Sequence, residues 1–240
     1  MPWVEQLVAR GVDAVALPLI EIAAPTDPAA VEAAWRRLGE RAGVVFVSAN
    51  AVARFFAARP AGAEWPSTIV AAVPGPGTAQ SLRAEGVPAA AIVAPAADAA
   101  QLDSESLWQE LGRRDWRGRS VLVVRGDGGR DWLVERLVEA GATVDALAAY
   151  RRLAPLLSAA ARRDLDAALA APAQHAWLFS SSEAIAHLES IVGATIAAGA
   201  RALATHPRIA ARARQAGFTE VIEVHPGLDA VVACIQSMQP

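Results

Sequence analysis

The chain contains no lysine, because all 22 of its basic residues are arginine. Schiff-base enzymes, including every pyridoxal-phosphate enzyme, require a lysine amine. A P-loop nucleotide hydrolase requires a lysine on the phosphates of its nucleotide. The sequence therefore excludes both classes of enzyme.

Cysteine, histidine and net charge are also low. The single cysteine, Cys234, cannot form an internal disulfide, so we expect a cytoplasmic protein. The four histidines are scattered with no cysteine or carboxylate at ligand spacing, so no metal site is predicted. A net charge of −3 argues against nucleic-acid binding. No apolar run reaches the roughly 18 residues of a membrane helix, so we expect no membrane partner.

Short apolar runs alternate along the chain with amphipathic segments. With 240 residues and 54% hydrophobic content, the chain can form one large or two small domains. Apolar runs of this length are typical of strands buried on both faces of a parallel sheet. The pattern predicts an α/β fold with parallel sheets. The predicted strands are 14–20, 44–48, 69–73, 90–94, 121–125, 144–150, 176–180, 202–205 and 221–224.

Helices are predicted between these strands, and some carry recognisable start signals. Asp27 is a predicted N-cap followed by a proline, and Ser104 and Ser182 occupy expected N-cap positions. The predicted helices are 3–10, 28–41, 50–58, 77–85, 104–113, 130–140, 158–170, 182–192, 207–216 and 228–236.

Three blocks of sequence recur in the same order, roughly 130 residues apart. The pair FVSANAVA at 46–53 and FSSSEAIA at 179–186 is the clearest of them. The recurrence predicts two similar α/β domains. In the second copy, a strand and a glycine-rich loop (121–130) precede the helix 130–140, whereas the first copy begins at its helix. We therefore expect the first copy to lack a strand, through either a start codon assigned too late or a true loss.

Two glycine-rich turns follow predicted strands and are candidate anion sites. Gly75-Pro76-Gly77-Thr78 would direct free helix amides and a hydroxyl at an anion, although an ordinary turn would also explain it. The segment 125–130 (RGDGGR) adds two guanidinium groups that can pair with carboxylates or phosphates. Its position at the carboxyl end of a strand favours ligand binding over a structural turn. The Arg-Gly-Asp triplet within it is interpreted as coincidence.

Hydroxyl groups supply the remaining candidates. Ser48, Ser181 and Ser182 stand where strands end and helices begin, so each is a helix cap or a donor to an anionic ligand. A nucleophilic role is not predicted, because no G-x-S-x-G motif is present. Tyr150, the only tyrosine, is followed by two arginines and could donate a proton, although the sequence alone favours a structural role at a domain edge.

An ordered set of segments resembles the uroporphyrinogen-III synthase family. No single segment is diagnostic, but together they span essentially the whole chain. The segments are LPLIEI (17–22), VVFVSANAV (44–52), AVPGPGTA (72–79), LDSESL (102–107), VLVVRGDGGRDWL (121–133), the junction Tyr150-Arg151-Arg152, and LFSSSEAI (178–185).

The resemblance implies two doubly wound α/β domains joined by a two-stranded linker, with the substrate cleft between them. Residues 1–18 with 156–240 would form the first domain. Residues 26–148 would form the second, and 19–25 with 149–155 the linker strands. Members of the family usually begin with a strand that ends in an Arg-Pro turn, and this strand is absent from the sequence.

The resemblance also implies a reaction. The family converts hydroxymethylbilane, a linear tetrapyrrole with eight carboxylates, into uroporphyrinogen III with loss of water and inversion of ring D. It uses no cofactor and no metal. We expect a monomer that receives its substrate by transient hand-over from porphobilinogen deaminase. By this resemblance Tyr150 is the catalytic residue, and the substrate-binding residues are Ser48, Gly77, Thr78, Arg125, Gly126, Gly128, Ser181, Ser182, Thr205 and Arg208.

One segment departs from the family pattern. Residues 203–210 read LATHPRIA where relatives commonly have a Gly-Pro turn followed by threonine, so His206 and Arg208 replace small and hydroxyl groups. Two alternatives stay open. The chain could be a non-catalytic two-domain module that binds a small anion or a tetrapyrrole. It could also be a sugar-nucleotide transferase, although such enzymes are usually longer.

Overall fold

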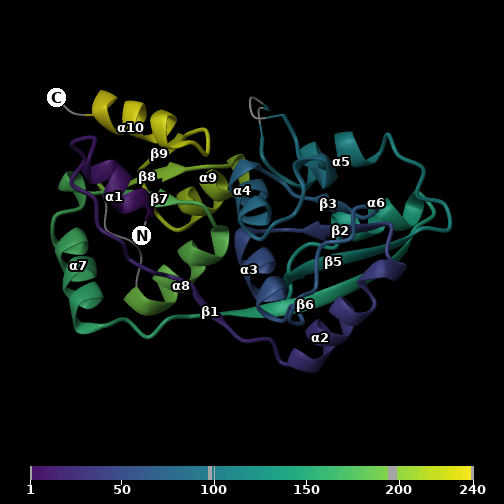
Figure 1. Cartoon of the computed structure of the whole chain (residues 1–240). Helices are drawn as coiled ribbons and strands as arrows, with labels where there is room; N and C mark the ends of the chain where they lie inside the picture. The colour runs from purple at the N-terminus through teal and green to yellow at the C-terminus, as the bar shows by residue number, and fades with distance from the viewer. Residues whose placement is uncertain (1, 97–98, 100, 194–198, 239–240) are drawn as a thin grey trace. The chain divides into compact units, whose positions relative to one another are not determined.

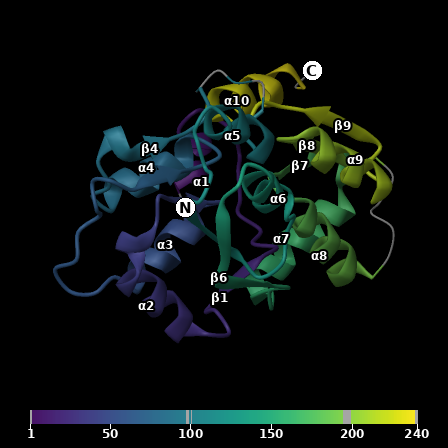
Figure 2. The same ribbon diagram turned by 90° about the vertical axis from the view of Figure 1, so that its right-hand side faces the viewer.

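A computed structural model describes residues 2–96, 99, 101–193 and 199–238. The chain forms two compact units (Figures 1 and 2). Unit 1 comprises Met1–Glu21 and Leu153–Pro240, and unit 2 comprises Ile22–Arg152. The chain therefore passes between the units twice, at Glu21/Ile22 and at Arg152/Leu153.

A six-stranded sheet forms the centre of unit 2 in the described residues, with strand order β1-β6-β5-β2-β3-β4. The pairs β2–β3, β2–β5, β3–β4 and β5–β6 are parallel. This arrangement confirms the predicted α/β class. The strands are β1 (Glu21–Ala23), β2 (Gly43–Phe46), β3 (Val70–Ala72), β4 (Ile92–Val93), β5 (Ser120–Gly126) and β6 (Thr143–Leu153). The helices are α2 (Pro28–Arg36), α3 (Ala49–Ala57), α4 (Pro76–Ala84), α5 (Ser104–Leu111) and α6 (Trp132–Glu139), with 3₁₀ turns at Leu38–Glu40 and Ala89–Ala91.

Helices cover both faces of this sheet, as the continuous apolar strands require. Successive residues of a strand point to opposite faces, so Val44 and Val45 belong to different hydrophobic clusters. Val44 lies in the cluster with α2, α3 and α4, in which Trp35 stacks on Phe55 at 4.8 Å between ring centroids. Val45 lies in the cluster with α5 and α6. Unit 2 is therefore a doubly wound sheet.

Unit 1 has a smaller sheet in its described residues, three parallel strands in the order β7-β8-β9. One hydrophobic cluster joins a face of this sheet to α7, α8 and α9, and a second joins α1 to α10 and to Leu178 of β7. The strands are β7 (Ala176–Phe179), β8 (Arg201–Ala204) and β9 (Glu220–Glu223). The helices are α1 (Pro2–Val8), α7 (Ala159–Ala170), α8 (Ser182–Val192), α9 (Pro207–Gln215) and α10 (Leu228–Ser237), with a 3₁₀ turn at Pro172–Gln174.

The predicted strand 14–20 is wrong, because residues 12–20 form no regular secondary structure. Pro18 has no N–H group to donate to a ladder. Leu19 is instead buried in the cluster of α8 and α9, and its carbonyl oxygen lies 2.7 Å from Nδ1 of His187. The segment is therefore held by side-chain packing rather than by strand pairing.

Two predicted N-caps and one helix end also differ. Asp103 caps α5 through a 2.9 Å bond from the Ser106 N–H, and Ser181 caps α8, so Ser104 and Ser182 are the first helical residues instead. The cap at Asp27 is confirmed by a 3.1 Å bond from the Ala30 N–H. The predicted helix 28–41 ends at Arg36. Glycine at position 39 is unfavourable in an α-helix, and the chain continues there as a 3₁₀ turn.

Candidate active site

The strand order of unit 2 creates a switch point between β2 and β5. From β2 the chain builds outward through β3 and β4, and it then returns to place β5 and β6 on the other side of β2. Ligands of open α/β sheets bind outside the carboxyl ends of the strands at such a point. Ser48 follows β2, and Arg125 and Gly126 end β5, so three predicted site residues lie at this point.

Tyr150 and Ser48, 102 residues apart in the sequence, are joined by a hydrogen bond. Their hydroxyl oxygens lie 3.0 Å apart, and either can donate. The Ser48 hydroxyl also caps α3, where it accepts the Ala51 N–H at 3.2 Å. Tyr150 is 3% exposed, and its ring packs in the cluster that includes Val44. The phenol is therefore held at both its ring and its hydroxyl.

Gly126 provides the surface against which the Tyr150 ring lies. A Cβ at position 126 would be 2.8 Å from Cε2 and 3.0 Å from Cζ of Tyr150. Any other residue would force the ring to move, because such a contact is far inside van der Waals distance. The pairing of β5 with β6 shifts register between Arg125 and Gly126, so Gly126 lies opposite Tyr150. The structure thus brings Ser48, Gly126 and Tyr150 together.

Asp127, which is not among the predicted site residues, holds the Tyr150 segment through two hydrogen bonds to its backbone. Its N–H donates to the carbonyl oxygen of Tyr150 at 2.9 Å, and its carboxylate accepts the Arg152 N–H at 3.0 Å. Asp127 of this triplet therefore has a structural role in the turn after β5. An aspartate in a glycine-flanked turn after a strand is a usable signal, because aspartate side chains commonly accept nearby backbone N–H groups.

Both arginines of the predicted anion loop have carboxylate partners within unit 2. Arg125 Nη1 lies 2.5 Å from Asp131 Oδ1, and Arg130 binds both oxygens of Glu105 at 2.6 and 3.1 Å. The hydrogen bond that Arg130 donates to Glu105 raises the pKa of Arg130, so this guanidinium stays charged. Gly128, between the two arginines, has a φ of +73°, a conformation that favours glycine.

The amino end of α4 forms a second group of donors, after β3. Gly75 is the N-cap and has no side chain to accept a hydrogen bond, and the Pro76 that follows has no N–H. The N–H groups of Gly77 and Thr78 are among the first four of the helix, which lack intrahelical acceptors. Thr78 is buried in the first turn. A Cβ at Gly77 would meet nothing within 4 Å, so packing does not require glycine there.

The remaining predicted residues belong to unit 1, at the carboxyl ends of β7 and β8. Ser181 caps α8 by accepting the Glu183 N–H at 3.2 Å, and Ser182 begins that helix. The Thr205 N–H donates to the carbonyl oxygen of Phe179 at 3.1 Å, which ties the ends of the two strands together.

His206 replaces the expected small residue at the start of α9 and serves as its N-cap. Its Nδ1 accepts the N–H of Arg208 at 3.0 Å, so the neutral ring carries its proton on Nε2. The exposed Arg208 lies in the first turn of this helix.

Neither a metal cluster nor a membrane span is found in the described part of the chain. The described residues contain no group of three or more His, Cys, Asp or Glu side chains placed to hold a metal ion. Within the same ranges, no helix has the length and apolar character needed to cross a membrane.

Comparison with known proteins identifies one family. The family described as uroporphyrinogen-III synthase HemD matches residues 2–233 of the chain. A uroporphyrinogen-III synthetase from Helicobacter pylori has a TM-score of 0.60 at 16% identity, covering 92% of this chain and 91% of that one. A mutant uroporphyrinogen III synthase from the extremely thermophilic bacterium Thermus thermophilus has a TM-score of 0.59 at 17% identity, covering 99% and 93%. At these identities, the two structures support the α/β fold.

Proposed function

We infer that this chain, which belongs to the uroporphyrinogen-III synthase family, cyclises hydroxymethylbilane to uroporphyrinogen III with loss of water and inversion of ring D. The observation that supports this inference most directly is the hydrogen-bonded pair of Tyr150 and Ser48 at the switch point of the unit 2 sheet. A phenol at that position can act on a ligand bound at the carboxyl ends of the strands.

We propose that Tyr150 assists the departure of the hydroxyl group from ring A. The Ser48 oxygen accepts a hydrogen bond from the Ala51 N–H. The Ser48 hydroxyl can therefore donate its own proton in the hydrogen bond to the Tyr150 oxygen. The phenol proton is then available to the leaving hydroxyl. Departure of that group leaves a cationic azafulvene, and water is the product. Ring D then attacks through its substituted carbon to give a spiro intermediate. The original bond from that carbon to the bridge toward ring C breaks, the bridge carbon bonds instead to the unsubstituted α carbon of ring D, and the proton lost from that carbon restores the Tyr150 phenol. These steps are governed by positioning.

The eight carboxylates of the substrate require many donors. We propose that the amides of Gly77 and Thr78, the Thr78 hydroxyl and the free nitrogens of Arg125 bind carboxylates in unit 2, with Gly126 and Gly128 shaping the loop. In unit 1 we propose the same role for Ser181, Ser182, Thr205 and Arg208. Each exposed ion pair contributes about 0–1 kcal/mol, so affinity must come from many contacts.

A coupled assay tests the activity. Porphobilinogen and porphobilinogen deaminase are supplied to the purified chain, and the oxidised porphyrin isomers are separated. Hydroxymethylbilane closes by itself to isomer I, so predominant isomer III is the expected result. Isomer I alone would contradict the proposal. Binding of the tetrapyrrole without turnover would favour the alternative of a non-catalytic binding module.

The variant Tyr150→Phe separates a catalytic phenol from a structural ring. We expect a folded variant with a lower kcat and measurable residual activity, because positioning of the substrate remains. An unchanged kcat would assign Tyr150 to the hydrophobic cluster alone. Complete inactivity of the folded variant would make the phenol essential rather than assisting.

We also propose that the chain acts as a monomer that takes hydroxymethylbilane from porphobilinogen deaminase before spontaneous closure. Light scattering of the purified chain tests the first point. For the second, the fraction of isomer III is measured while the deaminase concentration is varied at fixed flux. A fraction that depends only on flux would argue against hand-over.

A further inference from the structure

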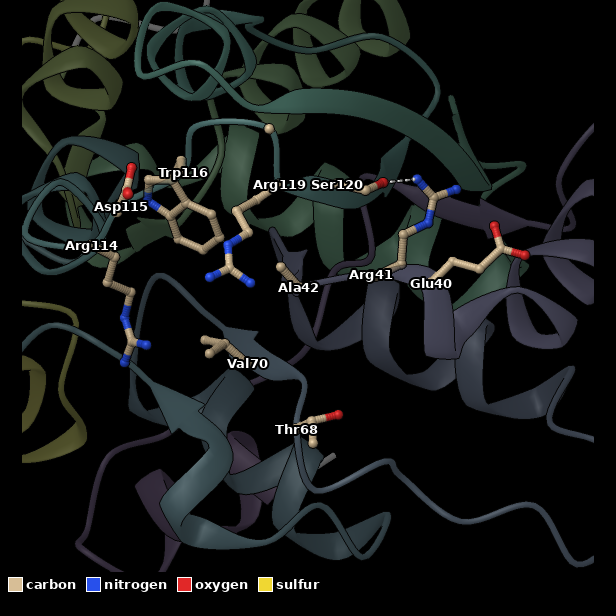
Figure 3. A pocket seen from close by; sticks show the side chains of 11 residues that line it. Glu40, Arg41, Ala42, Thr68, Val70, Arg114, Asp115, Trp116, Arg119 and Ser120 are labelled. Atoms are coloured by element: carbon tan, nitrogen blue, oxygen red, sulfur yellow. Dashed lines mark hydrogen bonds between the residues drawn. The ribbon is translucent and has the colours of Figure 1, made fainter.

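A pocket of about 740 Å³ lies at the end of the unit 2 sheet where its strands begin (Figure 3). Ala42, Val70 and Ser120 line it where β2, β3 and β5 begin. Ser48 and Gly126 lie at the carboxyl ends of β2 and β5, so the pocket is separate from the candidate active site.

An arginine-rich loop between α5 and β5 forms one wall of this pocket. Residues 112–120 read GRRDWRGRS, four arginines with a single acid. Trp116 anchors the loop, because its indole is buried and its Nε1 donates to the Leu111 carbonyl oxygen at 2.8 Å. The indole also packs beside Gly43, where a Cβ would be 3.3 Å from the ring. The arginines are therefore carried by a fixed backbone rather than by a loose loop.

Two of these arginines extend into the pocket without an internal partner. Figure 3 shows the guanidinium group of Arg119 directed toward Val70 and the side chain of Arg114 along the wall beside it, and both residues line the pocket. Among the described residues, neither side chain makes an ion pair or hydrogen bond. The nearby carboxylate of Glu40 lies 2.8 Å from Arg37, and the hydrogen bond from Arg37 lowers the pKa of Glu40. Glu40 therefore has a cationic partner outside the pocket.

Arg41 is a buried residue of the pocket wall on the side of Ser120. Its side chain is 7% exposed, and its Nη1 lies 2.5 Å from Asp145 and 2.7 Å from the Ser120 hydroxyl. Its Nε is buried and, among the described residues, has no hydrogen-bond partner. Because this nitrogen has almost no accessible surface and the guanidinium is already held by Asp145 and Ser120, Arg41 forms part of the pocket wall and offers no direct contact to a ligand.

We propose that this pocket binds a small oxyanion with two or more negative charges, held by Arg114 and Arg119. Guanidinium groups bind phosphate and carboxylate oxygens in the same planar geometry, so both chemistries fit. The proposal is independent of the cyclisation reaction, because none of these residues belongs to the candidate active site.

Isothermal titration calorimetry with pyrophosphate and, in a second arm, with citrate tests the proposal at low ionic strength. The double variant Arg114→Ala/Arg119→Ala removes the two guanidiniums that line the pocket and have no ion-pair partner among the described residues. Its matched control is Arg36→Ala/Arg113→Ala, which removes two exposed arginines of the same unit that do not line the pocket. We expect at least roughly ten-fold weaker binding in the first variant and less than about two-fold change in the control. Tighter binding of pyrophosphate than of citrate indicates a phosphate ligand, and the reverse order a carboxylate ligand.

Equal weakening in both double variants would show general charge attraction and overturn the proposal. Unchanged affinity in Arg114→Ala/Arg119→Ala, or no saturable binding of either anion by the parent chain, would overturn it as well.

Discussion

The contact between Gly126 and Tyr150 makes Gly126→Ala a sharp test of the candidate site. The added Cβ would lie 2.8 Å from Cε2 of the ring. The optimal separation of two non-bonded carbon atoms is about 3.5–4.0 Å, so the ring must move away by about 0.7 Å or more. The φ of Gly126 is not positive, so alanine does not strain the backbone. The substitution therefore acts through the ring alone.

Two effects of Gly126→Ala follow from this displacement. Overpacking costs about 1–3 kcal/mol, which lowers the melting temperature of a chain of this size by about 2–12 °C. Moving the phenol also breaks its 3.0 Å contact with Ser48. A misplacement of about 1 Å can cost roughly 10²-fold in rate, so we expect a fall in kcat of about that size.

The assay measures kcat and KM for isomer III formation together with thermal unfolding. The control is Gly39→Ala, because a Cβ at Gly39 would meet nothing within 4 Å and its φ is not positive. In a Tyr150→Phe background, Gly126→Ala should still lower stability but should lower kcat little further, because the hydroxyl is already absent. An unchanged kcat and melting temperature in the single variant would refute the reasoning.

Two further predictions concern single side chains. Ser48→Ala should cost about 1 kcal/mol of stability through loss of the α3 cap and should also lower kcat, because the Tyr150 hydroxyl loses its partner. Ser158→Ala, which removes an equivalent cap with a 3.2 Å bond in unit 1, should lower stability alone, and an equal fall in kcat would contradict the role of Ser48. Burial, together with the negative charge of Glu220, raises the pKa of Cys234. Its alkylation midpoint should therefore lie at a higher pH than in the unfolded chain, and stability should fall as pH rises above the usual thiol pKa, because the unfolded chain then loses the thiol proton more readily. A midpoint at or below the unfolded value would contradict this.

Local patterns in the sequence were sufficient for much of the secondary structure. Helix α8 was predicted with both ends correct, and α4 was predicted within one residue at each end. Apolar runs such as 121–125 indicated a buried parallel sheet, and β5 contains that run. These features depend on residues close together in the chain, where capping, periodicity and side-chain type act directly.

The segment 14–20 shows the limit of such patterns. Its apolar composition is that of a strand, but a strand also needs a neighbouring edge with which to pair. In the structure Leu19 packs among helices instead, and the segment remains irregular. Composition therefore predicted its burial but not its hydrogen bonding.

The sequence by itself determined the α/β class, the absence of lysine chemistry and the hydroxyl, glycine and arginine candidates. Only the tertiary structure decided how they combine. Strand order places β5 beside β2, which brings Tyr150 to Ser48 across 102 positions and onto Gly126. The tertiary structure also pairs Arg130 with Glu105, 25 positions away, and leaves Arg114 and Arg119 at the opposite end of the sheet strands. The physical reason is that strand pairing and side-chain contact join residues distant in sequence, whereas propensity and periodicity act over a few neighbouring residues.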